Sequence, residues 1–252
     1  MNEIVQVERE FRYWKERAER FDNLYHIRKK GIEKFLCESY PYLENVDGYI
    51  VDVGCGTGVP DYILQKKLGR SVIGTDFSLS MLKVALLKER LRYLVQADAL
   101  HLTFPKNSLG AIICLTVLTD YRDKEPFYHE FYSCIKRGGI YVHGDYSLND
   151  GYWNLNEHTY PSAFSSEFEL SRESVEDVEQ KLVEVGFRVL KSESISFGVA
   201  MTVDDYLQIV KSRPGFKFDS GKEDEVRGIA EDYLLNKGLK REFVFIISKK
   251  EC

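Results

Sequence analysis

Three glycines at alternate positions, Gly54, Gly56 and Gly58, form the stretch of this sequence with the clearest chemical meaning. They follow a short run that is apolar except for one acid, Asp52. A helical pattern comes directly after them. Glycine is needed where the backbone takes a positive φ, or where a ligand comes too close for a Cβ atom. A buried strand, a glycine turn and a helix start together indicate a nucleotide-binding turn. The spacing is G-x-G-x-G, which differs from the G-x-G-x-x-G of dinucleotide-binding proteins.

An acidic residue, Asp76, ends the next apolar segment, 71–76, and lies 18 residues after Gly58. A carboxylate at the tip of the second strand of such a unit can accept hydrogen bonds from both hydroxyls of a ribose. The alternative is that Asp76 only caps the following helix, although Ser78 suits that role better. Because the glycine turn lies upstream, we interpret Asp76 as a ligand-binding residue.

Apolar runs and helical patterns alternate through the chain. We expect strands over 49–53, 71–76, 91–96, 109–116, 140–145, 187–196 and 242–247. We expect helices over 8–25, 27–38, 61–67, 79–86, 124–136 and 175–185, with two more inside 197–240. This alternation implies a doubly wound α/β sheet with right-handed crossovers. The run 109–116 is almost entirely apolar, as in the central strand of a parallel sheet.

Several of these features together resemble the class I S-adenosylmethionine-dependent methyltransferases. They are the glycine turn with an acid two residues before it, the acid after the second strand, another after the third, and the Lys-Arg-Gly-Gly turn at 136–139. The resemblance covers about 45–195 and is nearest to methyltransferase-domain enzymes that act on small metabolites. It implies a Rossmann-like, seven-stranded sheet, mostly parallel with an antiparallel last strand.

The resemblance also implies S-adenosyl-L-methionine as the cofactor, bound along the carboxyl ends of the strands. Asp98 would accept from the adenine amine, because an unpaired buried donor is costly, although it is also an ordinary loop residue. The end of the fourth strand, at Leu115, would lie beside the methionine part, and the leading segment would fold over the cofactor. The implied cofactor-binding residues are Asp52, Gly54, Cys55, Gly56, Gly58, Asp76, Phe77, Met81, Asp98, Ala99, Leu115, Tyr25 and Trp14.

We expect one domain over 1–252, with a helical N-terminal cap over 1–44 and two insertions over 147–171 and 197–240. Both insertions follow strands whose carboxyl ends point to the cofactor edge, and the first is irregular and rich in aromatic residues. Together they would close a mostly apolar pocket as a substrate lid, which favours a small acceptor over a polymer. The alternative is that the aromatic side chains only form the cores of small insertions.

The chemistry implied is attack by an acceptor atom on the sulfonium methyl group, in line with the departing sulfur. The protein must then align the reactants and exclude water, and it needs a general base only if the acceptor must lose a proton. His158, His143 and Tyr146 are candidates for that base, and each suits a structural role equally well. The sequence thus leaves the catalytic residue unassigned.

The composition limits the classes of partner that we expect this protein to bind. A formal net charge of −5 and a pI near 5.7 argue against a broad nucleic-acid-binding surface. The five cysteines form no C-x-x-C pair, so we expect no metal site and reduced thiols. No secretory signal is visible and the longest apolar run is far too short to span a bilayer, so we expect a cytoplasmic protein without membrane contact. A monomer and a homodimer both remain open.

Two alternatives to a small-molecule methyltransferase stay open. One is a regulatory protein that binds S-adenosylmethionine without turnover, and the other is a methyltransferase acting on protein or RNA. The segment 116–121 lacks the Asn/Asp-Pro-Pro-Tyr and Pro-Cys sequences of enzymes that methylate nucleic-acid bases. A nicotinamide-dependent dehydrogenase would require the G-x-G-x-x-G spacing that is missing here.

Overall fold

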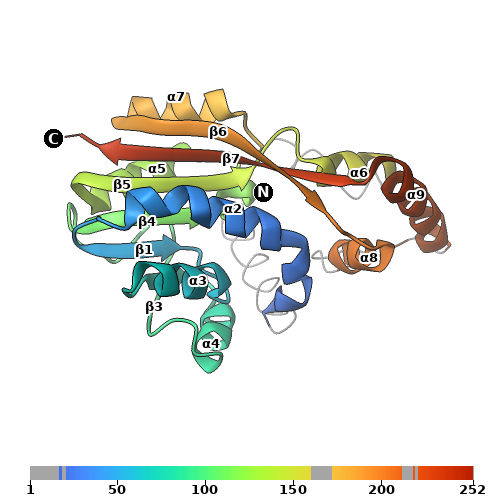
Figure 1. Ribbon diagram of the computed structural model, residues 1–252, viewed down its shortest axis with the longest axis horizontal. Helices are drawn as coiled ribbons and strands as arrows, with labels where there is room; N and C mark the ends of the chain where they lie inside the picture. Colours follow the sequence, from blue (N-terminus) through green and yellow to red (C-terminus); the bar gives the residue numbers. More distant parts are fainter. Residues whose placement is uncertain (1–16, 19–20, 160–171, 212–217, 219–220, 252) are drawn as a thin grey trace.

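The sheet has seven strands in the order β3-β2-β1-β4-β5-β7-β6 (Figure 1). The structure is a computed structural model that describes residues 17–18, 21–159, 172–211, 218 and 221–251. The strands are β1 (Tyr49–Val53), β2 (Ile73–Asp76), β3 (Tyr93–Gln96), β4 (Leu109–Leu115), β5 (Ile135–Tyr146), β6 (Phe187–Val199) and β7 (Leu239–Lys250). β7 is antiparallel to β5 and β6, and the pairs from β3 to β5 are parallel. The predicted doubly wound sheet with an antiparallel last strand is therefore confirmed.

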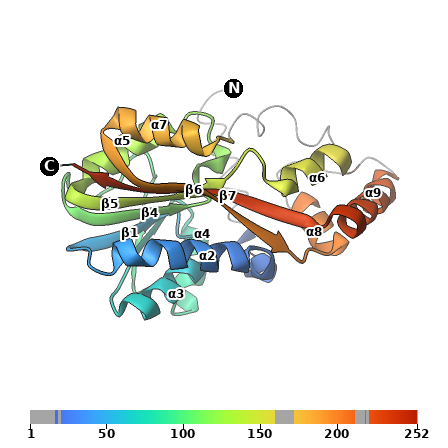
Figure 2. The same ribbon diagram turned by 45° about the horizontal axis from the view of Figure 1, so that its top comes forward.

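Helices cover both faces of this sheet, as Figure 2 shows. On one face lie α2 (Tyr25–Leu43) and α3 (Val59–Leu68), and on the other lie α5 (Glu125–Cys134) and α7 (Val175–Val185). α4 (Leu79–Leu87) packs beside β2 and β3 at the edge. Every residue of β4 is buried, because the strand lies between two hydrophobic cores.

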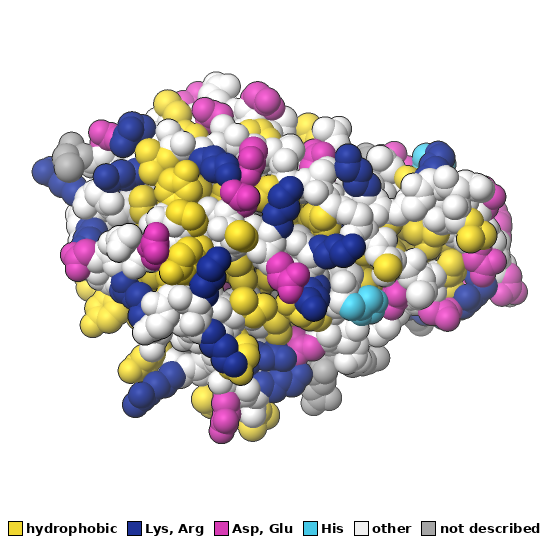
Figure 3. All heavy atoms as spheres, in the orientation of Figure 1, with side chains coloured by type: hydrophobic (Ala, Val, Ile, Leu, Met, Phe, Trp, Pro, Cys, Tyr) yellow, Lys and Arg dark blue, Asp and Glu magenta, His cyan; other side chains and the backbone are white. Residues whose placement is uncertain are grey.

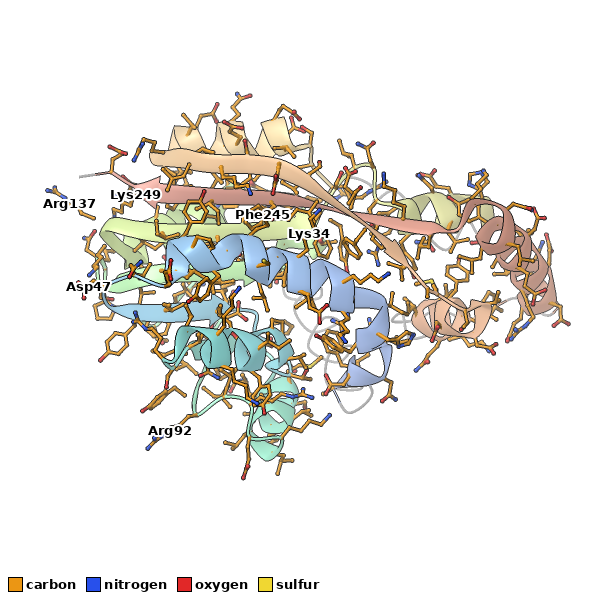
Figure 4. The ribbon with its side chains drawn as sticks, in the orientation of Figure 1. Lys34, Asp47, Arg92, Arg137, Phe245 and Lys249 are labelled. Carbon is orange, nitrogen blue, oxygen red and sulfur yellow. The ribbon has the colours of Figure 1, made fainter. Side chains whose placement is uncertain are left out.

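The parallel strands point their carboxyl ends towards a small helical lobe, which consists of α6 (Gly151–Thr159), α8 (Val203–Lys211) and α9 (Lys222–Lys237). β6 and β7 are long, with 13 and 12 residues, and extend past β5 to this lobe. Figure 4 shows Asp47, Arg137 and Lys249 at the opposite end of the sheet, away from the helical lobe. It also shows Phe245 of β7, whose ring meets Phe35 of α2 edge-on at 5.5 Å.

The helical lobe has a hydrophobic core of its own. Its buried residues include Tyr152, Trp153, Leu155, Tyr206 and Val226. Leu24 and Ile27, from the segment that leads into α2, also belong to this core. The helical lobe is thus tied to the start of α2 as well as to the ends of β6 and β7.

Several elements differ from the sequence-based prediction. α2 was expected to end before Pro41 but continues to Leu43. Proline is tolerated there because it removes a single hydrogen bond close to the helix end, while the fully buried Leu43 anchors the last turn. The segment 147–171 was predicted to be irregular, but it contains α6, whose buried face includes the polar residues Asn156 and Thr159 and so gives no continuous apolar stripe in the sequence. β5 begins at Ile135, before the predicted 140.

The predicted helix over 8–25 falls mostly outside the described residues. Its described end, Phe21–Leu24, is a 3₁₀ turn. Within the described ranges, no helix combines the length and the apolar character that crossing a bilayer requires. On the face shown in Figure 3, basic and acidic side chains are interspersed, and no area carries one sign alone.

Candidate cofactor site

The glycine turn follows β1 directly, and all three of its glycines have left-handed backbone conformations. The φ angles of Gly54, Gly56 and Gly58 are 77°, 54° and 74°. A Cβ atom on Gly54 would lie 2.2 Å from a methyl carbon of Val117, in the loop after β4. Gly54 is therefore required for the close packing of this loop against the turn.

Gly56 is much less crowded than Gly54 among the described residues. The nearest atom to a Cβ built on Gly56 is a ring carbon of Phe21, at 3.8 Å. The backbone of Gly56 is thus the part of the turn that a ligand can approach. Phe21 lies above it, on the segment that leads into α2.

The Asp76 carboxylate is fastened to the glycine turn. Its Oδ2 atom accepts from the Gly56 N–H at 2.9 Å, and its Oδ1 atom accepts from the Ser78 N–H at 2.8 Å. Burial raises the pKa of Asp76 to about 6, although both N–H bonds act to lower it. Each carboxylate oxygen has a second lone pair, so both can still accept from ligand hydroxyls. The ligand-binding interpretation of Asp76 and the capping alternative therefore fit the same geometry.

Asp52 lies beneath the turn and faces Asp61, in the first turn of α3. The two residues are 5% and 2% exposed. Burial raises the pKa of Asp61 to about 7, and burial together with the charge of Asp61 raises the pKa of Asp52 well above its usual range. Two such carboxyls cannot both ionise, so the pair holds a shared proton at neutral pH. Cofactor contact by Asp52 stays a prediction, because its carboxyl group is turned towards Asp61.

Asp22 ties the leading segment to the glycine turn. Its Oδ1 atom accepts from the Thr57 hydroxyl at 2.6 Å. Its Oδ2 atom pairs with Lys88 at 2.5 Å and with Arg90 at 2.8 Å. Burial alone would raise the pKa of Asp22, but hydrogen bonds from Lys88, Thr57 and Arg90 hold it below the usual value. The sequence analysis missed this residue, since an acid in a charged helical segment gives no signal of such a contact.

The other predicted cofactor residues are spread along the edge. Asp98 is exposed, and its Oδ1 atom accepts from the Leu100 N–H at 2.9 Å. Cys55 and Met81 are buried. Phe77, Ala99 and Tyr25 are partly exposed, and Trp14 lies outside the described residues. Their contacts with a cofactor remain predictions.

The end of β4 also has an unusual backbone. Leu115 is 9% exposed, and the next residue, Thr116, has a φ of 57° although it is not glycine. The Thr116 N–H donates to the Gly144 carbonyl at 2.7 Å. Such conformations persist where the surrounding structure holds them, and they are common at functional sites. The edge next to the glycine turn is therefore held in a defined shape.

The three candidate bases have very different surroundings. His143 is fully buried between Tyr128 and Tyr141, and burial, helped by the charge of Lys124, lowers its pKa to about 3. Its Nδ1 atom lies 3.1 Å from the Tyr141 hydroxyl. This placement in the core under α5 favours a structural role for His143.

His158 is exposed on α6, where its Nδ1 atom hydrogen-bonds the Asn154 carbonyl at 2.7 Å. Tyr146 is the candidate at the carboxyl end of β5, partly buried against Phe243. The guanidinium of Arg241 lies 4.1 Å above its ring. Of the three candidates, Tyr146 is the one at the edge that carries the glycine turn.

A buried ionic cluster fixes the neighbouring loops. The Lys124 ammonium, 1% exposed, lies 3.0 Å from Glu173 Oε2 and 3.6 Å from Asp145 Oδ2. The Thr119 hydroxyl and the Tyr146 N–H both donate to Asp145 Oδ1. The cluster joins the loop after β4 to the end of β5. The sequence did not indicate Lys124 as part of this cluster, because it resembles an ordinary charged residue at the start of an exposed helix.

The strand order, the antiparallel β7 and the glycine turn after β1 are those of the Rossmann-like methyltransferase fold. Residues 51–143 match the protein family described as "Methyltransferase domain". The matched segment begins within β1 and ends in β5, and so contains the glycine turn, Asp76 and Asp98.

Known methyltransferases are similar to this chain in sequence and in fold. The chain is 27% identical over 189 residues to phosphoethanolamine N-methyltransferase 1 of Zea mays, covering 73% of this chain and 35% of the maize protein. It therefore spans about a third of that relative's length. A protein of Bacillus halodurans C-125, assigned as a methyltransferase, has the same fold, with a TM-score of 0.63 and 16% identity over 86% of this chain and 99% of that one.

A second solved structure carries ligands. Phosphoethanolamine N-methyltransferase 2 of Haemonchus contortus, in complex with phosphomonomethylethanolamine and S-adenosylhomocysteine, gives a TM-score of 0.59 and 19% identity. The match covers 87% of this chain and 53% of that one. At these identities both structures show a shared fold.

Proposed function

We propose that this protein binds S-adenosylmethionine at the glycine turn and transfers its methyl group to a small-molecule acceptor. The observation that carries the proposal is the pairing of Gly56 with Asp76. The turn presents an open backbone at Gly56, and a carboxylate with free lone pairs is fixed directly beside it. A ribose and the chain attached to it need these two features side by side.

Each part of S-adenosylmethionine would have its own partner at this edge. Asp76 would accept from the ribose hydroxyls, and Asp98, which is exposed, is available for the adenine amine. The segment Phe21–Leu24 would cover the cofactor from the side opposite the sheet. S-adenosylmethionine supplies a methyl group already activated by the sulfonium charge, so the chain's contribution is alignment and exclusion of water.

The proposed size of the acceptor follows from the elements that lie around the glycine turn. The leading segment lies over the turn through Asp22 and joins the core of the helical lobe through Leu24 and Ile27. A site bounded by these elements suits a small acceptor better than a polymer. Relatives named for phosphoethanolamine methylation are consistent with an acceptor of this size.

Two measurements test the proposal. Calorimetry with S-adenosylmethionine and S-adenosylhomocysteine tests the cofactor, and failure to bind either one would overturn it. Incubation with a labelled methyl donor and a metabolite extract, and separately with phosphoethanolamine, tests transfer. Label in a small molecule is the expected result. Binding without transfer into any compound would instead support a regulatory protein, and label only in protein or RNA would move the acceptor to that class.

A further inference from the structure

Arg28, on the first turns of α2, forms no ion pair with a carboxylate in the part of the chain that the structure describes. Its Nη2 atom donates to the Phe21 carbonyl at 3.1 Å, and its guanidinium lies 3.9 Å above the centre of the Phe21 ring. Among the described residues, no acidic side chain comes within ion-pair distance of it. The side chain is nevertheless partly buried, and burial lowers its pKa, although the charge of Asp22, which is already paired with Lys88 and Arg90, acts in the opposite direction. A buried cation normally has a counter-charge.

The position of Arg28 connects it to the proposed site. The Phe21 ring beneath it is the group nearest to the open side of Gly56, at 3.8 Å from a Cβ built there. Tyr146, at the end of β5, is close enough to raise the pKa of Arg28. Arg28 thus lies between the glycine turn and the candidate at the end of β5.

The other cations at this edge differ from Arg28. Lys88 and Arg90 both pair with Asp22. Arg241, which is 6% exposed, binds both carboxylate oxygens of Asp150 at 2.7 and 2.9 Å. Arg28 is the exception, since among the described residues it donates to a neutral carbonyl, which leaves most of its N–H groups available.

We propose that Arg28 binds an oxyanion of the ligand that occupies this edge. The inference rests on the proposed function, which places a ligand at the edge. A guanidinium has five donors in a planar fork that matches a carboxylate or a phosphate, and stacking on Phe21 fixes the plane of the fork. The oxyanion is either the carboxylate in the amino-acid part of the methyl donor or an anionic group on the acceptor.

The test uses three variants of the full chain. Arg28→Gln removes the charge, and Arg28→Lys keeps the charge without the fork. Lys30→Gln makes the same change in charge at an exposed position of α2 and serves as the control. Thermal melts of all three check that they fold. Calorimetry then compares S-adenosylhomocysteine with 5′-methylthioadenosine, which lacks the amino-acid part.

If the oxyanion belongs to the cofactor, Arg28→Gln should weaken S-adenosylhomocysteine binding at least tenfold and leave 5′-methylthioadenosine binding unchanged. Arg28→Lys should fall in between. If the oxyanion belongs to the acceptor, Arg28→Gln should bind S-adenosylhomocysteine normally but lose binding of inorganic phosphate or phosphoethanolamine, tested with and without S-adenosylhomocysteine.

The proposal is overturned if Arg28→Gln matches Lys30→Gln in both arms, including the case in which the wild-type protein binds neither anion. That result differs from failure of the proposed function, in which the wild-type protein would bind neither S-adenosylmethionine nor S-adenosylhomocysteine.

Discussion

The glycine turn takes its parts from neighbouring segments of the chain, whereas the helical lobe is assembled from segments that lie far apart. The Gly56 N–H and the Asp76 carboxylate are 20 residues apart in sequence. In the helical lobe, Thr159 meets Tyr206 across 47 residues, and Asp205 of the lobe meets His26 of α2 across 179. The turn is therefore set by local backbone rules, while the helical lobe depends on long-range packing.

This difference separates two tasks. The local part of the molecule offers an open glycine and a fixed carboxylate, which suit a cofactor common to many enzymes. The long-range part, tied to the leading segment through Leu24 and Ile27, is where the acceptor would be selected. If the division is correct, variants in one region should leave the other region's property intact.

The largest expected effect is at the turn. Gly56→Val should abolish binding of S-adenosylhomocysteine, because the side chain would fill the space that the ligand needs. The fold should survive with a loss of about 1–2 kcal/mol from the left-handed backbone. Gly69→Val is the matched control, since Gly69 has a φ of 67° and open space around it but lies at the end of α3. Calorimetry and urea unfolding on both variants check this, and normal binding by Gly56→Val would show that the ligand lies elsewhere.

The next effect tests the helical lobe. Leu155→Ala removes a fully buried side chain and should cost about 3 kcal/mol of stability in the helical lobe. S-adenosylhomocysteine affinity should stay within about threefold, while methyl transfer is lost. Leu64→Ala makes the same change in α3 and should weaken cofactor binding. Equal loss of affinity in both variants, measured by calorimetry, would contradict the division between the two regions.

A smaller effect is expected at the strand end. Asp76→Ala should weaken cofactor binding by roughly 1–3 kcal/mol, because it removes the acceptor for the ribose hydroxyls. Since the pKa of Asp76 in the free protein is about 6, affinity of the wild-type protein should fall as pH drops below 6. Calorimetry at pH 7.5 and pH 5 should show about a tenfold loss. Asp76→Ala should lack the part of this dependence centred near pH 6, and an identical profile would exclude Asp76 as the group involved.

The sequence-based prediction was accurate for the sheet and the glycine turn, and less accurate for the leading segment and the helical lobe. All seven strands could be predicted, because buried strands appear as short apolar runs between turns. The antiparallel direction of β7 followed only from the resemblance to the methyltransferase family. Gly54 and Gly58 were recognisable because a positive φ restricts the residue type.

The parts that could not be predicted depend on contacts between distant segments. Asp22 and Arg28 occur in a leading segment whose charges resemble those of any exposed helix, and only its position over the turn distinguishes them. α6 was missed because its buried face contains the polar residues Asn156 and Thr159, which interrupt the apolar pattern of a helix. His143 attracted attention by its residue type, although its surroundings in the core could not be seen from the sequence.

The smallest effect separates stability from binding within the glycine-turn region. Burial raises the pKa of Asp61 from 3.8 to about 7, so the folded protein holds a proton that the unfolded chain releases above about pH 4. The contribution of this pair to stability therefore falls as pH rises from 4 to 7, and it falls further until Asp52, whose pKa is also raised, has lost its proton. Asp61→Asn should stabilise the protein by about 1–2 kcal/mol at pH 8, because the amide can donate to Asp52 without a shared proton.

The gain from Asp61→Asn should be smaller at pH 5, which lies close to the unfolded pKa of 3.8 and well below the folded pKa of about 7. Urea unfolding at the two pH values measures it, and Asp224→Asn, on the exposed first turn of α9, controls for the change in net charge. Equal stability differences at pH 8 and pH 5 would mean that Asp52 and Asp61 do not share a proton. A gain at pH 8 with unchanged S-adenosylhomocysteine affinity would instead assign the pair to the support of the turn, and the ligand contacts to Gly56 and Asp76 above it.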